Sequence, residues 1–121
     1  MNEQPNSRRF DLRERTFKYA KRVREYVEKL PKTLRNIEDA KQLVRASGSV
    51  GANYIEAEEA LSKKDFVMRI KIARKESKES RFWLRLLDTG ASTELDTERK
   101  RLVQEANELT LIFGAIVRKI E

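Results

Sequence analysis

The stretch FVMRIKIARKESKESRFWLRLL, residues 66–87, decides the fold that we expect for this chain. At alternating steps of four and three residues it carries one line of apolar or small side chains: Phe66, Ile70, Ala73, Ser77, Ser80, Leu84 and Leu87. Such a line over three heptads is typical of an amphipathic helix that packs on other helices. A second line lies beside it: Ile72, Glu76, Glu79, Trp83 and Leu86. A helix with two adjacent lines fits between several neighbours, so we interpret the other segments as helices that cover this one.

The segments before this stretch predict two helices. The first is expected from about Asp11 to Leu30, and Pro31 ends it because the residue before a proline is disfavoured in the α-helical conformation. Its apolar line is Leu12, Phe17, Ala20, Val23, Val27 and Leu30. The second is expected to begin near Asn36, an acceptable N-cap with Asp39 three residues on. Its line is Ala40, Leu43, Ser47, Val50, Tyr54, Ala57 and Leu61.

A run of small residues, ASGSVGA at 46–52, is the weak point of the second helix. Each glycine costs about 1 kcal/mol relative to alanine inside a helix, so a loop here is the alternative. We expect a continuous helix, because the apolar line before Ser47 continues after Val50 without a change of register. The small residues then allow a neighbouring backbone to approach closely.

Capping residues separate the last two helices. Ser62 is expected to cap the helix of residues 66–87, with Asp65 at the capping-box position. Gly90 suits a left-handed C-terminal cap, and Thr93 or Asp96 then caps a fourth helix. The line of the fourth helix is Leu102, Ala106, Leu109, Phe113, Ile116 and Ile120.

These segments predict a single all-α domain, an antiparallel up-down-up-down four-helix bundle. We assign residues 10–121 to the bundle and residues 1–9 to a mobile basic tail. Several apolar residues fall outside the main lines: Val67, Met68, Phe82, Trp83, Val103, Leu111, Ile112 and Val117. They indicate either a wide core or an interface between subunits.

Composition excludes several classes of function. Among the 121 residues there is no His and no Cys, which removes the usual general base, thiol chemistry and zinc sites of the ordinary type. No phosphate loop or dinucleotide fingerprint is present. We therefore expect no enzyme, no catalytic residue and no cofactor. The absence of Cys, of an apolar leader and of a membrane span predicts a cytoplasmic protein.

Polar residues beside the apolar lines predict a structural network that fixes helix register. Its expected members are Ser47, Asn53, Glu56, Arg74, Glu76 and Glu79. A buried carboxylate needs a cation or several donors, and Arg45, Arg74 or an arginine of a neighbouring chain could supply one. The functional alternative is a carboxylate metal site, which we favour less than the structural network; our expectation is no bound metal.

The charge is +7 overall and uneven along the chain. Residues 8–32 and 63–85 are both rich in Lys and Arg, and adjacent basic faces would bind phosphate backbones without sequence preference. The alternative is a solvated face with ion pairs between residues four apart, such as Arg24 with Glu28. The contact residues that we expect lie where a basic tail continues into a basic helix: Arg8, Arg9, Arg13, Arg15, Lys18, Lys21 and Arg22.

Two motifs carry a family resemblance. The run RASGSVGANYIEA at 45–57 and the run IARKESKESRFWLRLL at 72–87 resemble the signatures of the bacterial four helix bundle, or intervening-sequence, protein family. Seven residues match recurrent positions of that family: Ser47, Ser49, Asn53, Glu56, Glu76, Glu79 and Trp83. The family is similar to the accessory variability determinant of diversity-generating retroelements, a basic pentameric bundle that binds nucleic acid and a reverse transcriptase. The resemblance implies a homopentamer and suggests RNA or DNA binding.

The function that we expect is therefore a non-enzymatic, oligomeric scaffold that binds nucleic acid with little sequence selectivity. The alternative is a protein–protein interaction scaffold whose basic charge serves solubility only. A contiguous basic surface would favour the first function, and alternating charges would favour the second. No membrane partner is expected.

Overall fold

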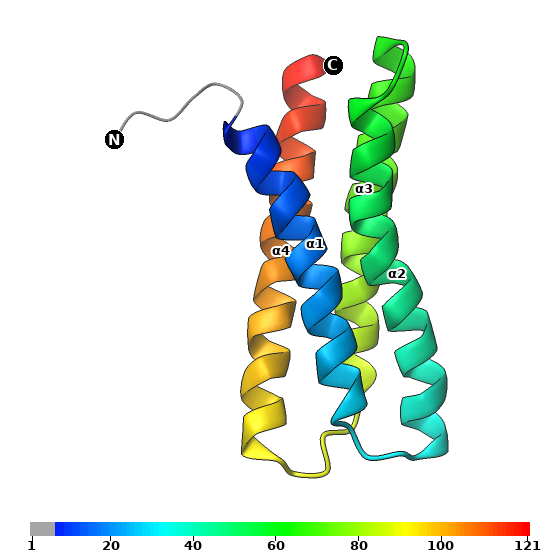
Figure 1. The fold of residues 1–121 in the computed structure, drawn as a ribbon, viewed down its shortest axis with the longest axis vertical. Helices are drawn as coiled ribbons and strands as arrows, with labels where there is room; N and C mark the ends of the chain where they lie inside the picture. Colours follow the sequence, from blue (N-terminus) through cyan, green and yellow to red (C-terminus); the bar gives the residue numbers. More distant parts are fainter. Residues whose placement is uncertain (1–6) are drawn as a thin grey trace.

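The computed structural model describes residues 7–121, with side chains from Leu12 onward, and these residues form four helices joined by short loops (Figure 1). Their bounds are α1 Ser7–Glu28, α2 Leu34–Glu58, α3 Lys63–Leu86 and α4 Thr93–Ile120. Successive helices run in opposite directions along the long axis, and the described residues contain no strand. The predicted all-α antiparallel four-helix bundle is confirmed. Most of the predicted 1–9 tail lies outside the described residues, and its last three residues belong to α1.

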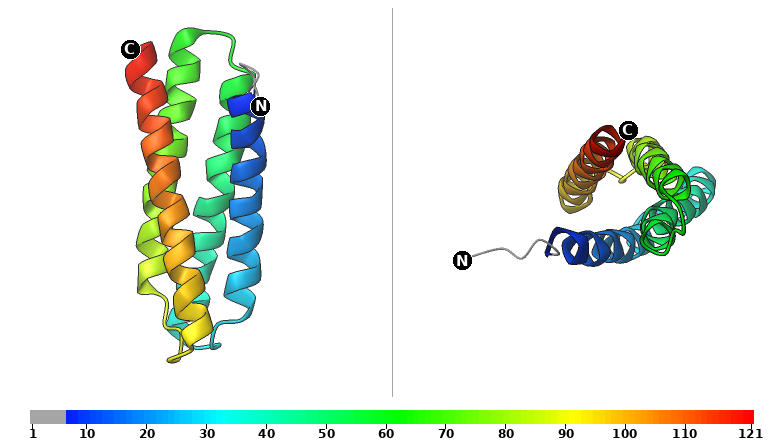
Figure 2. Two further views of the ribbon diagram at one scale, coloured as in Figure 1. Left: turned by 90° about the vertical axis from the view of Figure 1, so that its left-hand side faces the viewer. Right: turned by 90° about the horizontal axis from the view of Figure 1, so that it is seen from above.

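Seen along the long axis, the helices occupy four corners in the order α1, α2, α3, α4 (Figure 2). Helices α2 and α3 therefore each pack on two sequence neighbours, and α1 and α4 contact each other across the remaining side. The α2–α3 and α3–α4 pairs make the most extensive contacts, whereas α1 and α4 contact each other least. The stretch 66–87 thus lies within the most closely packed part of the fold, as its two lines predict.

Hydroxyl side chains begin three of the helices. Ser62 caps α3 as predicted, because its Oγ accepts a hydrogen bond of 3.0 Å from the Asp65 N–H. The cap of α2 is Thr33 rather than the predicted Asn36, and the cap of α4 is Ser92 rather than Thr93 or Asp96. In both cases a hydroxyl one to four residues earlier reaches the free N–H groups of the first turn, so the predicted residues are already inside the helix.

Asn36 has a different role, which the sequence did not indicate. Its side chain is buried between the α1–α2 and α3–α4 loops. Its Nδ2 donates to the carbonyl oxygens of Pro31 at 3.0 Å and Asp88 at 2.8 Å, and its Oδ1 accepts from the Asp88 N–H at 2.9 Å. Asn36 therefore satisfies backbone groups of both loops at one end of the bundle.

Most predicted core lines are buried. On α2 and α3 these include Leu43, Val50, Tyr54, Ile70 and Leu84, and on α4 the positions 102, 106, 109 and 113 are fully buried. The predicted line of α1 is buried at Leu12, Val23 and Leu30 but was wrong at Phe17. Its buried positions follow strict steps of four and three: Leu12, Thr16, Tyr19, Val23, Tyr26 and Leu30. The predicted Phe17 is 61% exposed, and Leu61 at the end of the α2 line is fully exposed.

The small-residue run of α2 is helical throughout, which confirms the continuous helix. A Cβ built on Gly51 would lie 3.0 Å from Oγ1 and 3.2 Å from Cβ of Thr16 on α1. Only hydrogen fits at that position, so Gly51 allows α1 to approach α2 closely. The packing reason expected for the glycines is therefore present.

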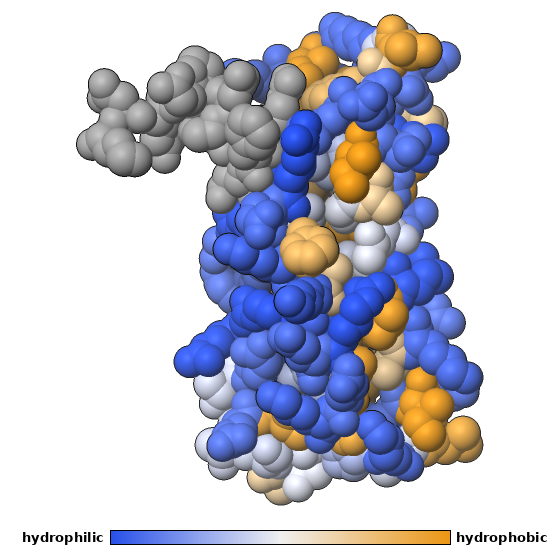
Figure 3. Space-filling view, in the orientation of Figure 1, coloured by the Kyte–Doolittle hydropathy of each residue, from blue (hydrophilic) through white to orange (hydrophobic). Residues whose placement is uncertain are grey.

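The face of α1 and α2 in Figure 3 is mainly hydrophilic and carries scattered apolar side chains. Of the surplus apolar residues, Val67 and Val117 belong to the core. Met68, Phe82 and Leu111 are 46%, 55% and 70% exposed. The surplus is thus divided between a wide core and the surface. No described helix has an apolar stretch long enough to cross a membrane.

Candidate nucleic-acid interface

Three of the arginines predicted on α1 form ion pairs within the chain. Arg13 pairs with Glu58 of α2. Arg15 pairs with two carboxylates of α4, at 2.8 Å from its Nε to Glu105 and 2.7 Å from its Nη2 to Glu108. These contacts join α1 to both of its neighbours, so the cations offset negative charge inside the fold.

Arg22 completes this set, with its Nη2 at 3.1 Å from Oε1 of Glu98 on α4. The hydrogen bond to Glu105 and the nearby carboxylates raise the pKa of Arg15 above its ordinary value despite partial burial. The hydrogen bonds from Gln104 and Arg15 lower the pKa of Glu108. Both shifts favour the charged forms, as expected for ion pairs that hold α1 against α4.

The remaining predicted contact residues of α1 differ in their surroundings. Lys18 and Lys21 are exposed, and no described carboxylate forms an ion pair with either. The side chains of Arg8 and Arg9 lie outside the described residues. Among the predicted contact residues with described side chains, therefore, Lys18 and Lys21 remain as cations open to an external phosphate.

The predicted polar network separates into two groups between α2 and α3. In one, Arg45 lies 3.5 Å from Glu76 and 3.2 Å from Glu79. In the other, Arg69 donates to Asn53 at 3.3 Å and lies 3.8 Å from Glu56. The structure thus supplies Arg45 as the cation for Glu76 and Glu79.

Three further details complete this network. Ser47 is buried and bonds only to the Val44 carbonyl of its own helix. Glu76 Oε1 is buried without a hydrogen-bond partner among the described residues. Arg74 lies apart from both groups, on the side of α3 that faces α4. Among the described residues, no three or more His, Cys, Asp or Glu side chains gather where they could hold a metal ion.

One side of α3 carries a line of five cations. At steps of three and four residues its members are Lys71, Arg74, Lys78, Arg81 and Arg85, which we call the cation line. Lys71, Lys78 and Arg85 are exposed, and Arg74 and Arg81 are half-buried. The line spans about 21 Å at 1.5 Å per residue. Every position on this side of the helix is therefore positive over four turns.

The edge of α4 that faces the cation line is nearly free of acidic residues. Its members at steps of four and three are Lys100, Gln104, Asn107, Leu111, Gly114, Arg118 and Glu121. Arg81 donates to Asn107 at 2.7 Å, and Lys71 forms an ion pair of 3.0 Å with Glu121. These two contacts fix the antiparallel register of the two edges.

Three carboxylates of α4 lie on its other side, whereas Asp96 accepts a hydrogen bond from Thr89 of the α3–α4 loop. Glu98, Glu105 and Glu108 all pair with arginines of α1. The fold thus separates the charges of α4, with acids toward α1 and neutral or basic side chains toward α3. The result is a mainly positive α3–α4 edge, on which the cation line, Lys100 and Arg118 lie with one acid, Glu121.

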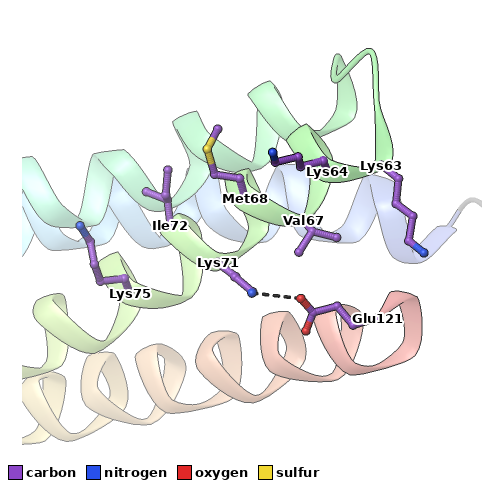
Figure 4. A pocket seen from close by; sticks show the side chains of 8 residues that line it. All are labelled: Lys63, Lys64, Val67, Met68, Lys71, Ile72, Lys75 and Glu121. Carbon is purple, nitrogen blue, oxygen red and sulfur yellow. Dashed lines mark ion pairs between the residues drawn. The ribbon is translucent and has the colours of Figure 1, made fainter.

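A groove lies at one end of this edge (Figure 4). It has a volume of about 900 Å³, with apolar lining from Val67, Met68 and Ile72. Its lysines all come from α3, and they are Lys63, Lys64, Lys71 and Lys75. Lys71 reaches across to Glu121 at the end of α4. The positive surface therefore continues beyond the cation line toward the start of α3.

The sequence is rich in Lys and Arg over residues 63–85, but the contacts that we predicted from it lie on α1. The spacing 71, 74, 78, 81, 85 is a signal in the sequence itself, since it places five cations on one side of a helix. The ion pairs of Arg15 and Arg22 cannot be seen in the sequence, because they depend on which side of α4 faces α1.

Comparison with known proteins identifies the family. The family described as 23S rRNA-intervening sequence protein matches residues 8–114. The chain belongs to this family. A solved structure of similar fold is a protein of unknown function from the S23 ribosomal protein family of Bacteroides thetaiotaomicron VPI-5482. It is 27% identical, with a TM-score of 0.75, over 88% of this chain and 97% of that one. No curated protein matches the chain. The family resemblance drawn from the two sequence motifs is thus confirmed.

Proposed function

We propose that this intervening-sequence protein is a non-enzymatic scaffold that binds RNA or DNA through phosphate contacts along the α3–α4 edge. The observation that carries the proposal is the cation line, which runs for about 21 Å without a carboxylate among its members. At 3.4 Å per phosphate, one strand of a duplex would present about six phosphates over that length. Its contacts would be to the backbone, so sequence selectivity would be low.

We further propose that the protein acts as a homo-oligomer, with the pentamer implied by family resemblance as the expected size. Apolar side chains are exposed at the start of α2, Leu34 and Ile37, and near the end of α3, Phe82 and Leu86, and Trp83 is half-buried. We propose that a closed ring buries these side chains, which we call the apolar patch, and repeats the positive edge once per subunit. Light scattering should give five times the chain mass, and a monomer at tens of micromolar would contradict this part of the proposal.

We propose the cytoplasm as the location, since the proposed ligand, RNA or DNA, is found there. The exposed apolar patch also favours a second function, a scaffold for another protein. In that case the positive edge would serve only solubility, and nucleic acid would not bind.

The experiment compares two double variants that remove the same charge from exposed positions. Lys78→Gln with Arg85→Gln changes the cation line, and Lys18→Gln with Lys21→Gln changes the α1 surface. Structured RNA and duplex DNA are titrated at two salt concentrations by fluorescence anisotropy. We expect the first pair to reduce the slope of log K against log salt by about 2, at roughly 0.9 per lost phosphate contact.

The α1 pair is the matched control, and it also tests the contacts first predicted from the sequence. A loss of affinity with the α1 pair alone would move the interface to α1. No binding by the unmodified protein at about 50 mM salt, where phosphate contacts are strong, would leave the protein scaffold as the better proposal.

A further inference from the structure

Arginines from two helices meet above a glycine of α4. A Cβ built on Gly114 would lie 3.3 Å from Nη1 of Arg118, one turn further along α4. The same point is 3.8 Å from Nη1 of Arg74 on α3. The two guanidinium nitrogens are therefore within about 7 Å of each other, the limit that these two distances set. Two positive groups thus share one small region of the surface.

Neither guanidinium is neutralised within the described part of the chain. Among the described residues, no carboxylate forms an ion pair with Arg74 or Arg118. This contrasts with Arg15 and Arg22 on α1, which each pair with glutamates of α4. The acid nearest in sequence to Arg118, Glu121, is paired with Lys71. The two arginines therefore present unneutralised positive charge at the α3–α4 edge.

The glycine makes the convergence possible. Gly114 is buried in the last two turns of α4, and its backbone is helical, so its position does not require a left-handed conformation. Glycine is less favourable than alanine inside a helix. A side chain at this position would occupy the space that the guanidinium of Arg118 and the side chain of Arg74 now border. The absence of a side chain thus lets both cations lie close to the backbone of α4.

The geometry points to a binding site for one phosphate group of a nucleic-acid strand, held between Arg74 and Arg118 over Gly114. Guanidinium groups suit phosphate because their N–H donors form short charge-assisted bonds of about 2.8 Å to its oxygens. Two such bonds to one tetrahedral anion are compatible with the limit of about 7 Å between the guanidinium nitrogens of Arg74 and Arg118. The site rests on the proposed function, since it lies within the cation line and would fix one phosphate of the bound strand.

The neighbouring side chains indicate how a strand would continue from the site. Lys78 follows Arg74 by one turn and is exposed, and Arg81 and Arg85 follow in the same line. In the other direction the positive charge of Lys71 is offset by Glu121. A strand held at Arg74 and Arg118 would therefore extend toward Arg85.

The first test uses inorganic phosphate as the probe and backbone amide NMR as the readout. In the unmodified protein the Gly114 amide and the Arg74 Nε–H should shift in a saturable manner. Arg118→Gln should weaken phosphate binding at least tenfold. Lys119→Gln is the matched control, because it removes the same charge from the next residue of the same helical turn and should change binding less than twofold.

Gly114→Ala separates the shape of the site from its charge. The added methyl group meets mainly the flexible end of Arg118, and alanine favours the helix, so this variant should melt no lower than the unmodified protein. We expect it to weaken phosphate binding at least threefold. Equal binding by Gly114→Ala, Arg118→Gln and Lys119→Gln would overturn the site.

The second test uses a single-stranded RNA with and without a 5′-phosphate. Arg118→Gln and Gly114→Ala should each weaken RNA binding at least threefold more than Lys119→Gln, whether or not the 5′-phosphate is present. Dependence on the 5′-phosphate would assign the site to a strand end, overturning the backbone assignment. RNA binding that is unaffected by either variant would overturn the site and leave the proposed function standing. Saturable phosphate binding without any RNA binding would overturn the proposed function and assign the site to a free phosphate.

Discussion

Replacing Asn36 by alanine removes the only described side chain that bonds to both loops at one end of the bundle. The amide donates to the carbonyls of Pro31 and Asp88 and accepts from the Asp88 N–H, at 3.0, 2.8 and 2.9 Å. Because Asn36 is 2% exposed, water has little access to these backbone groups once the amide is gone. The variant therefore loses three hydrogen bonds and leaves their partners poorly satisfied.

The expected loss of stability follows from these three contacts. At about 1 kcal/mol per hydrogen bond, with more for a partner that stays buried and unpaired, the free energy of unfolding should fall by roughly 2–4 kcal/mol. For a domain of this size, 1 kcal/mol corresponds to about 4 °C in Tm. We therefore expect Asn36→Ala to melt roughly 8–16 °C lower.

Urea and thermal unfolding, followed by far-UV circular dichroism at one fixed protein concentration, measure this loss. Asn53→Ala is the matched control, because that half-buried amide donates to a carbonyl of its own helix, Ser49. The reasoning would be refuted if Asn36→Ala lost less than about 1 kcal/mol and no more than Asn53→Ala. The hydrogen bonds of Asn36 to the two loops would then not contribute about 1 kcal/mol each.

Three further predictions concern the core. Burial raises the pKa of Tyr19, and the contact of its hydroxyl with Ser80 offsets only part of that rise, so stability should fall as pH rises past about 10, the ordinary tyrosine value. Tyr19→Phe should be at least as stable at pH 7 and show a weaker alkaline loss in urea unfolding. Gly51→Val should cost roughly 2–3 kcal/mol, because its side chain would overlap Thr16, and unchanged chemical denaturation would contradict this close approach. Glu76→Ala should cost about 1–3 kcal/mol because Glu76 is buried beside a cation, whereas the exposed Glu56 should cost under about 0.5 kcal/mol. Calorimetry on the two variants would contradict this if the losses were equal.

The fold could be predicted from the sequence because the apolar lines of the last three helices hold strict four-three spacing. The line of α1 could not be predicted in the same way. Its buried positions include Thr16, Tyr19 and Tyr26, whose hydroxyls made them resemble surface residues, and the apolar Phe17 was taken instead. Burial here follows the spacing of the helix more closely than the polarity of the side chain.

The candidate interface was predicted less well, for a physical reason. Charge density along the sequence is high in both α1 and α3, but the sequence does not reveal which cations meet carboxylates of another helix. That depends on the rotation of α4, which turns Glu98, Glu105 and Glu108 toward α1. The Arg74–Arg118 convergence likewise requires the antiparallel register of α3 and α4, to which no local pattern points.

The ion pairs between α1 and α4 have a consequence for how the fold opens. These two helices contact each other least, and Arg15 and Arg22 tie them through partly exposed pairs that salt weakens. Helices α2, α3 and α4 share the most extensive packing, so we expect them to form one cooperative unit from which α1 separates first. In hydrogen–deuterium exchange, the amides of α1 should then exchange by sub-global opening at moderate ionic strength. Those of α3, at the centre of the packing, should exchange only when the whole domain unfolds.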